Sequence, residues 1–260
     1  MKSVHICTIY NRADQYHDLL KSLNAAGFSE DRCRYSGFDN SNHNSFDPYA
    51  TISRVMASTE EPYVFFCHQD ILLNQGHGYD ILMARLHQLD ELDPTWAVAG
   101  NAGISAKYKP VIRITDTGHS PNWKGSWPQL VIALDENLLI LRKGMGVYCT
   151  ASLWGFHFYG PDVCLNALVR GMSCYAIDFH VTHLSKGSFS TEFWEAKQRF
   201  EDHWSPQFLF SYYKTVTGKV ICLSRYNLLR ILGSFRWVSK LLIKINSIKP
   251  FLSPSTRQIR

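Results

Sequence analysis

The sequence predicts an α/β fold in which a mostly parallel sheet is flanked by helices and followed by a basic helical extension. Strand-like runs alternate with amphipathic helical segments along the first half of the chain, which is the order of a parallel sheet with crossover helices. The run at 63–67 is apolar, β-branched and aromatic, as is typical of a central strand buried on both faces. The chain has 260 residues and is 45% hydrophobic, which is enough for a sizeable core.

The individual elements follow from hydrophobic periodicity, with continuous or alternating apolar runs for strands and a spacing of three and four residues for helices. We predict strands over 4–9, 31–38, 63–67, 96–103, 131–136, 138–142 and 173–182, and helices over 14–23, 49–58, 79–92 and 163–171. The segment 105–128 is rich in glycine, proline and polar residues, so it is expected to form a long loop.

Cysteine usage and hydropathy predict a folded cytoplasmic protein. The seven cysteines stand singly, without a C-x-x-C pair, and are expected to be buried thiols in a reducing compartment. The first ten residues lack the apolar length of a signal peptide, and no run of 18 apolar residues predicts a membrane span.

Charge divides the chain into two predicted regions, a domain at 1–204 and an extension at 205–260. From His203 to the last residue there are ten lysines and arginines and no acidic residue. Because the whole chain carries +5, residues 1–202 carry −5. On a helical wheel the tail has an apolar arc, formed by Leu228, Ile231, Leu232, Phe235, Val238, Leu242 and Ile245. The opposite arc is cationic and contains Arg225, Arg230, Arg236, Lys240 and Lys244.

A cationic amphipathic helix of this kind suits peripheral contact with an anionic membrane, here the inner face of the cell membrane, where each cation adds about 1 kcal/mol. A helix packed on the acidic body would show the same pattern, and the sequence leaves both alternatives open. No nucleic-acid-reading motif accompanies the charge, so nucleic acid is not an expected partner.

Polar residues follow the central strand directly, in the order His68, Gln69, Asp70. In open α/β sheets, ligands bind beyond the carboxyl ends of the strands. His68 and Asp70 leave the same side of an extended chain, because strand periodicity is two. An imidazole nitrogen and a carboxylate oxygen suit Mn²⁺ or Mg²⁺ bound together with a phosphate. The alternative is a strand that simply ends in polar loop residues.

Three further positions carry a functional and a structural interpretation. Asp162 follows Pro161 at a predicted helix start, where it is either a general base that faces a cleft or a plain charge at the helix N-terminus. His183 lies at the tip of the last strand, as a metal ligand or as a polar loop residue. Asp39 follows the second strand, as a ribose ligand or as a turn former.

Together these residues resemble the family 2 glycosyltransferases of the GT-A fold, whose sheet is Rossmann-like. The turn Tyr10-Asn11-Arg12 is similar to the family's N-terminal TYNR signature, and Asp39 stands at its nucleotide-binding acid. His68-Gln69-Asp70 stands at its Asp-x-Asp metal motif, and Pro161-Asp162 stands at its paired acids, the second of which is the base. His183 resembles the late histidine of its metal site.

The resemblance covers residues 1–204 and is nearest to a bacterial polysaccharide-synthesis branch with His-Gln-Asp and Phe-His-Phe-Tyr segments. It implies an inverting hexosyltransferase that moves a sugar from a nucleotide-diphospho-sugar, a UDP-sugar, to a glycan or lipid-linked acceptor in surface polysaccharide synthesis. In both acidic motifs the first acid is replaced, by His68 and by Pro161, and the second carboxylate is retained.

The resemblance also implies roles for single residues. Mn²⁺ or Mg²⁺ would be held by His68, Asp70 and His183, and Asp162 would be the base. Arg12 and Lys186 would be the diphosphate partners if no metal is used. The implied donor-binding set is Thr8, Tyr10, Arg12, Asp39, Gln69 and Asp70. The implied acceptor wall is Trp154, His157, Phe158 and Tyr159, although Phe158 and Tyr159 fit a plain core equally well.

Two functions of other classes remain open from sequence. One is a GT-A-like module that binds a sugar nucleotide or a glycan without catalysis. The other is a metal hydrolase built on His68, Asp70, His180 and His183. Strand periodicity places His180 and His183 on opposite faces, which argues against the hydrolase.

Overall fold

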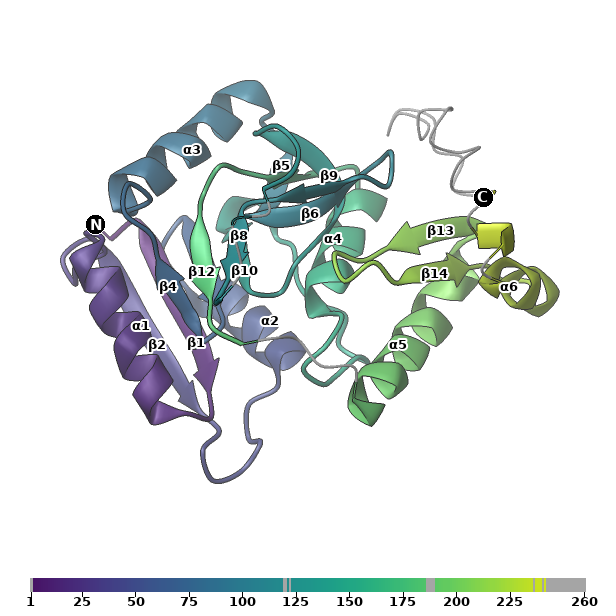
Figure 1. Ribbon diagram of the computed structural model, residues 1–260, viewed down its shortest axis with the longest axis horizontal. Helices are drawn as coiled ribbons and strands as arrows, with labels where there is room; N and C mark the ends of the chain where they lie inside the picture. The colour runs from purple at the N-terminus through teal and green to yellow at the C-terminus, as the bar shows by residue number, and fades with distance from the viewer. Residues whose placement is uncertain are drawn as a thin grey trace.

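A nine-stranded sheet forms the centre of the protein (Figure 1). The computed structural model describes residues 2–118, 121, 123–185, 190–235, 237–239 and 241. In spatial order the strands are β2 (Cys33–Asp39), β1 (Val4–Tyr10), β3 (Tyr63–Cys67), β10 (Leu138–Arg142), β5 (Trp96–Gly100), β11 (Ser173–Ala176), β9 (Gln129–Leu134), β6 (Ala102–Ser105) and β7 (Pro110–Ile112). The predicted α/β class is confirmed by this sheet and the helices on its faces.

The sheet is mixed, with a parallel half at β2, β1 and β3. β10 is inserted antiparallel between β3 and β5, and β9 and β7 also run against the remaining strands. The segment 105–128, expected as one long loop, contains β7 and a further short strand, β8 (Ile114–Asp116).

Helices cover both faces of the sheet, and each inserts its apolar side. α1 (Ala13–Ala25) and α3 (Tyr79–Leu92) pack on one face. α2 (Pro48–Ser58), α4 (Tyr159–Val169) and α5 (Thr191–Trp204) belong to the core of the other face. The central strand β3 serves both cores, because Phe65 points into the first and Phe66 into the second. This explains why its sequence is apolar without alternation.

A smaller sheet lies beside the main one and carries part of the site. Its order is β4 (Ile71–Leu73), β12 (Val181–His183) and β8. β4 follows the central strand after only three residues, 68–70, and β12 runs antiparallel to it. The pairing places His183 opposite Ile71, which is the residue after Asp70.

The C-terminal region begins with a hairpin that the sequence analysis did not predict. β13 (Ser211–Lys214) and β14 (Val220–Leu223) pair antiparallel and are followed by α6 (Asn227–Ser234). The buried Tyr213 donates its hydroxyl to the carbonyl of Ile132 at 2.6 Å, which ties the hairpin to β9. Two 3₁₀ turns, Lys143–Met145 and Ser205–Gln207, complete the elements. The described part of the chain contains no helix with the length and apolarity that a membrane crossing requires.

Candidate functional site

The polar residues after β3 and the histidine at the end of β12 meet at one edge of the sheet. The backbone amide of Leu184 donates to the carbonyl of Asp70 at 2.8 Å, which locks β12 beside β4. On the other side, the amide of His68 donates to the carbonyl of Asn137, in the turn before β10. Residues distant in sequence are thereby fixed around the end of the central strand, as expected for a ligand site of an α/β sheet.

His68, Asp70 and His183 form a compact cluster whose ligand atoms all lie within 4.8 Å of one another. Nδ1 of His68 lies 3.8 Å from Oδ1 of Asp70, and Nε2 of His183 lies 3.5 Å from Oδ2 of the same carboxylate. The structure therefore brings together all three residues that the sequence analysis assigned to a metal. Their role as ligands stays a prediction.

The electrostatics of the cluster favour a charged Asp70. Burial alone would raise the pKa of its carboxyl group, but the neighbouring imidazoles of His183 and His68 lower it well below its ordinary value. The pKa of His183 is raised, because Asp70 outweighs the opposing effect of burial. Burial lowers the pKa of His68, which favours a neutral ring with one nitrogen available as a ligand.

The donor set fits a divalent metal ion of intermediate hardness. Nε2 of His183 is buried without a hydrogen-bond partner among the described residues, although it points toward Asp70. An unpaired buried nitrogen is costly, and metal ligation would satisfy it. Two imidazole nitrogens and one carboxylate suit Mn²⁺ better than Ca²⁺, and three protein ligands leave positions open for phosphate oxygens.

A cavity of about 320 Å³ opens beside this cluster. Its wall is formed by Ile9, Tyr10, Asn11, Asn40, Asn44, Pro48, Phe66, Cys67, His68, Gln69, Asp70, Phe156 and Tyr159. The wall combines the tips of β1, β2 and β3 with the segment that precedes α4. A mixed polar and aromatic cleft that ends at a metal-binding edge is suited to a nucleotide with a diphosphate group.

The Tyr10-Asn11-Arg12 turn is held against the cluster by the side chain of Gln69. The amide groups of Asn11 and Arg12 both donate to Oε1 of Gln69, at 2.9 and 3.0 Å. Nε2 of Gln69 donates back to the side chain of Asn11 at 2.7 Å. Gln69 thus orients the turn that borders the cavity, in addition to lining the cavity itself.

The remaining donor-binding predictions differ in where their side chains lie. Tyr10 lines the cavity and stacks on Tyr16 with ring centroids 4.2 Å apart. Asp39 is near it, and a hydrogen bond from Ser41 lowers the pKa of Asp39. Arg12 turns outward to an ion pair with Asp14. Of these three residues Tyr10 lines the cavity, and their role in donor binding stays a prediction.

Thr8 does not line the described cavity. Thr8 is buried in β1, and its hydroxyl lies 3.3 Å from the sulfur of Cys67. Its side chain is therefore turned into the sheet interior, and its assignment to the donor-binding set stays a prediction. Lys186 lies outside the described residues.

Asp162 is buried in the part of the chain that the structure describes and does not face a cleft there, and its role as the base stays a prediction. Its side chain is fully buried, and its two carboxylate oxygens accept four hydrogen bonds. Thr150 donates its amide and its hydroxyl, each at 2.7 Å, Trp204 donates at 3.0 Å, and Asn166 donates at 3.2 Å. Burial raises the pKa of Asp162 to about 6, against the effect of these donors.

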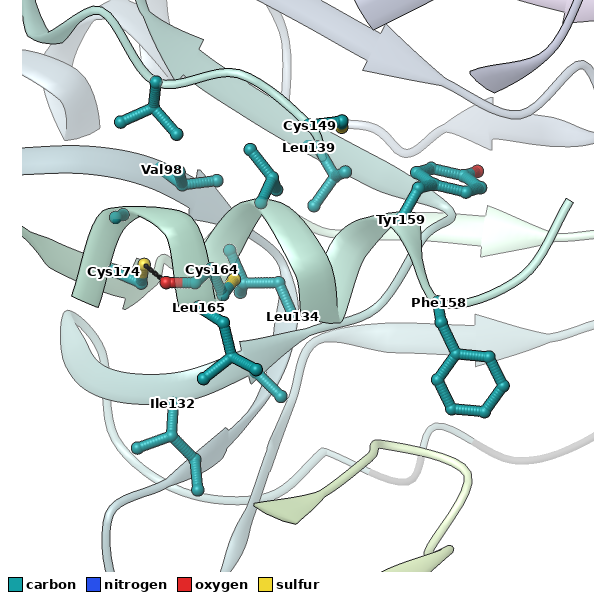
Figure 2. Close-up of a cluster of buried hydrophobic side chains, with 14 of the residues drawn as sticks. Val98, Ile132, Leu134, Leu139, Cys149, Phe158, Tyr159, Cys164, Leu165 and Cys174 are labelled. Atoms are coloured by element: carbon teal, nitrogen blue, oxygen red, sulfur yellow. Dashed lines mark hydrogen bonds between the residues drawn. The ribbon is translucent and has the colours of Figure 1, made fainter. Parts of the chain in front are cut away.

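The predicted acceptor wall is divided between cleft and core. Trp154 is exposed, and the guanidinium of Arg199 lies over its ring at 4.5 Å. His157 is half-buried against Phe193. Phe158 and Tyr159 are buried and point to opposite sides at the start of α4 (Figure 2). Phe158 is therefore core, whereas Tyr159 reaches the cavity.

The hydrolase alternative is not supported by the placement of His180. Its Nε2 lies 2.9 Å from the hydroxyl of Thr115, and its amide donates to Nδ1 of His77. Within the described residues, the metal-capable group contains His68, Asp70 and His183 but not His180.

The sequence analysis missed several residues of the site. Asp135 and Glu136 form the turn between β9 and β10; the charge of Asp135 contributes to the raised pKa of His183 and partly opposes the lowering of the pKa of His68 by burial. Asp116 lies 3.6 Å from Nδ1 of His183. The polar Asp-Glu-Asn sequence between two apolar runs is a turn signal that would have predicted the first two. The position of Asp116 beside His183 results from the pairing of β8 with β12, which no local sequence pattern predicts.

No family model matches the chain. It is 31% identical over 223 residues to the protein named ATP synthase subunits region ORF 6 of Fuscovulum blasticum, covering 83% of this chain and 88% of that relative. The structure of the present chain is similar to that of S. aureus TarS, residues 1–349, in complex with UDP-GlcNAc, with a TM-score of 0.50. The match has 13% identity and covers 76% of this chain and 65% of the TarS chain.

The two comparisons establish different things. At 13% identity the TarS match shows a shared fold, and this confirms the predicted GT-A-like architecture. The sequence match extends over most of both proteins and shows common descent. The chain therefore belongs to the family of the Fuscovulum blasticum ORF 6 protein, and the fold of this member is that of a GT-A-like glycosyltransferase.

Proposed function

We propose that the protein is an inverting glycosyltransferase that moves a hexosyl group from a UDP-sugar to a hydroxyl of a glycan or lipid-linked acceptor in bacterial surface polysaccharide synthesis. The observation that carries this proposal is the His68, Asp70 and His183 cluster at the mouth of the cavity beside Tyr10. The donor class is supported by TarS, whose structure was determined in complex with UDP-GlcNAc.

The donor is oriented by the two ends of the cavity. Tyr10, stiffened by its stack on Tyr16, offers an aromatic surface for the uracil ring, and Asp39 and Asn40 lie at the tip of the neighbouring strand for the ribose. The diphosphate then extends toward Asp70. Gln69 connects the turn at Tyr10–Arg12 to the metal cluster. Its side chain accepts hydrogen bonds from the amides of Asn11 and Arg12, and its backbone lies between His68 and Asp70.

His68, Asp70 and His183 would hold a Mn²⁺ or Mg²⁺ ion, which neutralises the charge that develops on the departing diphosphate. Asp70 supplies the negative charge, and the lowered pKa keeps its carboxylate ionised throughout the neutral range. The half-buried position of the cluster limits competition by water.

Asp135 is our proposed proton acceptor for the attacking hydroxyl. It is half-buried in the turn beside β10, and its charge reaches both histidines of the cluster. In an inverting transfer the acceptor hydroxyl attacks the anomeric carbon from the side opposite the diphosphate, and Asp135 would accept the proton that this hydroxyl loses. Asp162 then serves a positioning role, since its buried carboxylate accepts hydrogen bonds from Thr150 and Trp204 and so ties α4 to the segment before it and to α5.

The exposed face of α6 supports contact with an anionic membrane near a lipid-linked acceptor. Gly233 packs against the hairpin, where an added Cβ would lie 2.4 Å from the sulfur of Cys222. Large apolar side chains are exposed on α6 at Leu228, Leu229, Ile231 and Leu232, and after it at Phe235, Trp237 and Leu241. Arg225 supplies positive charge next to α6, whereas Arg230 on α6 forms an ion pair with Asp202 of α5 at 2.8 Å. Arg236, Lys240 and Lys244, which belong to the predicted cationic arc, lie outside the described residues, as do Leu242 and Ile245.

A thermal-shift screen with nucleotide-sugars, with and without Mn²⁺, tests the proposal. A bound donor stabilises the folded state by about 2.7 kcal/mol at a hundred times its dissociation constant. We expect a Mn²⁺-dependent shift with UDP-sugars, lost in His183→Ala and retained in His180→Ala, which removes a histidine outside the cluster. A shift that is insensitive to His183 contradicts the proposed site. Binding without transfer to any acceptor or to water indicates a non-catalytic module.

A further inference from the structure

The hydroxyl of Tyr159 connects the start of α4 to the proposed metal cluster. It lies 2.8 Å from Nε2 of His68 and 3.1 Å from the backbone carbonyl of Glu136. The side chain is 2% exposed, so these contacts are shielded from water. Tyr159 follows Phe158, whose φ of 69° is unusual for a residue with a side chain and turns the two rings to opposite sides (Figure 2).

We propose that Tyr159 is a positioning residue that fixes the ring tautomer of His68, so that Nδ1 presents its lone pair beside Asp70. The inference rests on the proposed function, because it assigns a purpose to the ring in metal binding. Through Tyr159, the first residue of α4, this helix would then help to orient a ligand of the proposed metal ion.

The number of protons available to these groups indicates which nitrogen of His68 is protonated. A tyrosine hydroxyl has one proton, and a backbone carbonyl only accepts hydrogen bonds. If the proton of Tyr159 points to the Glu136 carbonyl, its oxygen must accept from His68, and Nε2 of His68 therefore carries the hydrogen. Nδ1 is then the unprotonated nitrogen, and it is the atom that lies 3.8 Å from Oδ1 of Asp70. A histidine that ligates a metal typically donates its other ring N–H in this way.

Removing the hydroxyl of Tyr159 should favour the other ring tautomer of His68. In Tyr159→Phe, an Nε2–H of His68 would be buried without its acceptor. The other tautomer places the hydrogen on Nδ1, toward Asp70, where it blocks ligation. We expect Mn²⁺ alone to bind about 10- to 100-fold more weakly to this variant in calorimetric titration.

Tyr49→Phe is the matched control. Tyr49 is also buried, its ring lies 6.2 Å from that of Tyr159, and its hydroxyl donates to the carbonyl of His157 rather than to a cluster histidine. This variant should bind Mn²⁺ as the unsubstituted protein does. Equal affinity in Tyr159→Phe and the unsubstituted protein, or equal loss in both variants, would overturn the proposal.

Nitrogen-15 NMR of labelled histidines gives a readout that does not require a metal. In the metal-free protein, the signal that disappears in His68→Ala should show the Nε2–H tautomer, and that signal should change in Tyr159→Phe but not in Tyr49→Phe. An Nδ1–H tautomer of His68 in the unsubstituted protein contradicts the inference. Absence of Mn²⁺ binding together with the Nε2–H tautomer would instead refute the proposed function and leave the contact with Tyr159 in place.

Discussion

Substitution of Asp162 by asparagine separates a structural role of this carboxylate from a catalytic one. The group is fully buried and is surrounded by the donors of Thr150, Asn166 and Trp204. Its pKa rises from the ordinary 3.8 to about 6, chiefly because burial penalises the charge. A rise of this size corresponds to about 3 kcal/mol. Asparagine has nearly the same shape and no charge, so it mimics the protonated acid.

The raised pKa of Asp162 determines how the free energy of unfolding depends on pH. Between pH 4 and pH 6 the folded protein holds a proton on Asp162 that the unfolded chain has already released. The free energy of unfolding therefore falls as pH rises through this window, and the contribution of Asp162 is constant above it. We expect Asp162→Asn to gain about 3 kcal/mol relative to the unsubstituted protein between pH 4 and pH 7, because its own amide does not titrate.

Urea unfolding followed by tryptophan fluorescence at several pH values measures this difference directly. Other titrating groups cancel when the two proteins are compared at each pH. A difference that is the same at pH 4 and pH 7 would refute the buried, titrating carboxylate. Loss of sugar transfer by two or more orders of magnitude in a stably folded Asp162→Asn protein would show that this residue is the base after all.

Three further predictions address the cleft, the base and the tail. Gln69→Ala should weaken UDP binding about tenfold, because the turn at Asn11 loses three hydrogen bonds. Gln198→Ala, at an exposed position of α5, should leave UDP binding unchanged. Equal UDP titration curves for Gln69→Ala and the unsubstituted protein would contradict the bridging role of Gln69. Asp135→Asn should lower transfer at least about 100-fold with donor affinity retained, and normal turnover would remove Asp135 from the mechanism. Leu228→Glu combined with Ile231→Glu should abolish flotation with vesicles containing phosphatidylglycerol, whereas Leu92→Glu on α3 should not, since all three residues are exposed but only the first two lie on α6. If the unsubstituted protein fails to float, the membrane contact is refuted, and high salt should reduce flotation by screening.

Local patterns were sufficient for the main sheet and the residues at its strand tips. The unbroken apolar run of β3 predicted a strand that is buried on both faces, and the structure shows both faces buried. Turn chemistry also placed Tyr10 and Asp39 at the same edge. These features depend on residues that are neighbours in sequence or in adjacent strands.

Long-range pairing explains what the sequence did not reveal. His183 was assigned to the metal only through the family resemblance, because it reaches Asp70 by the pairing of β12 with β4, and the pairing residues are more than one hundred positions apart. The burial of Asp162 had a signal that was not used: α4 is apolar on nearly all sides, as in helices enclosed by the core. The hairpin at 211–223 was obscured by the basic charge of the tail, although Thr217-Gly218 marks its turn.

The central claim is that one metal ion, held by His68, Asp70 and His183, binds the diphosphate of a UDP-sugar. Anomalous X-ray scattering from crystals soaked with Mn²⁺ and UDP tests it most directly. We expect one manganese peak within coordination distance of Asp70 and His183 and next to Nδ1 of His68, beside the diphosphate, with the uracil ring beside Tyr10. A nucleotide bound in the cavity with no manganese at these three side chains would contradict it.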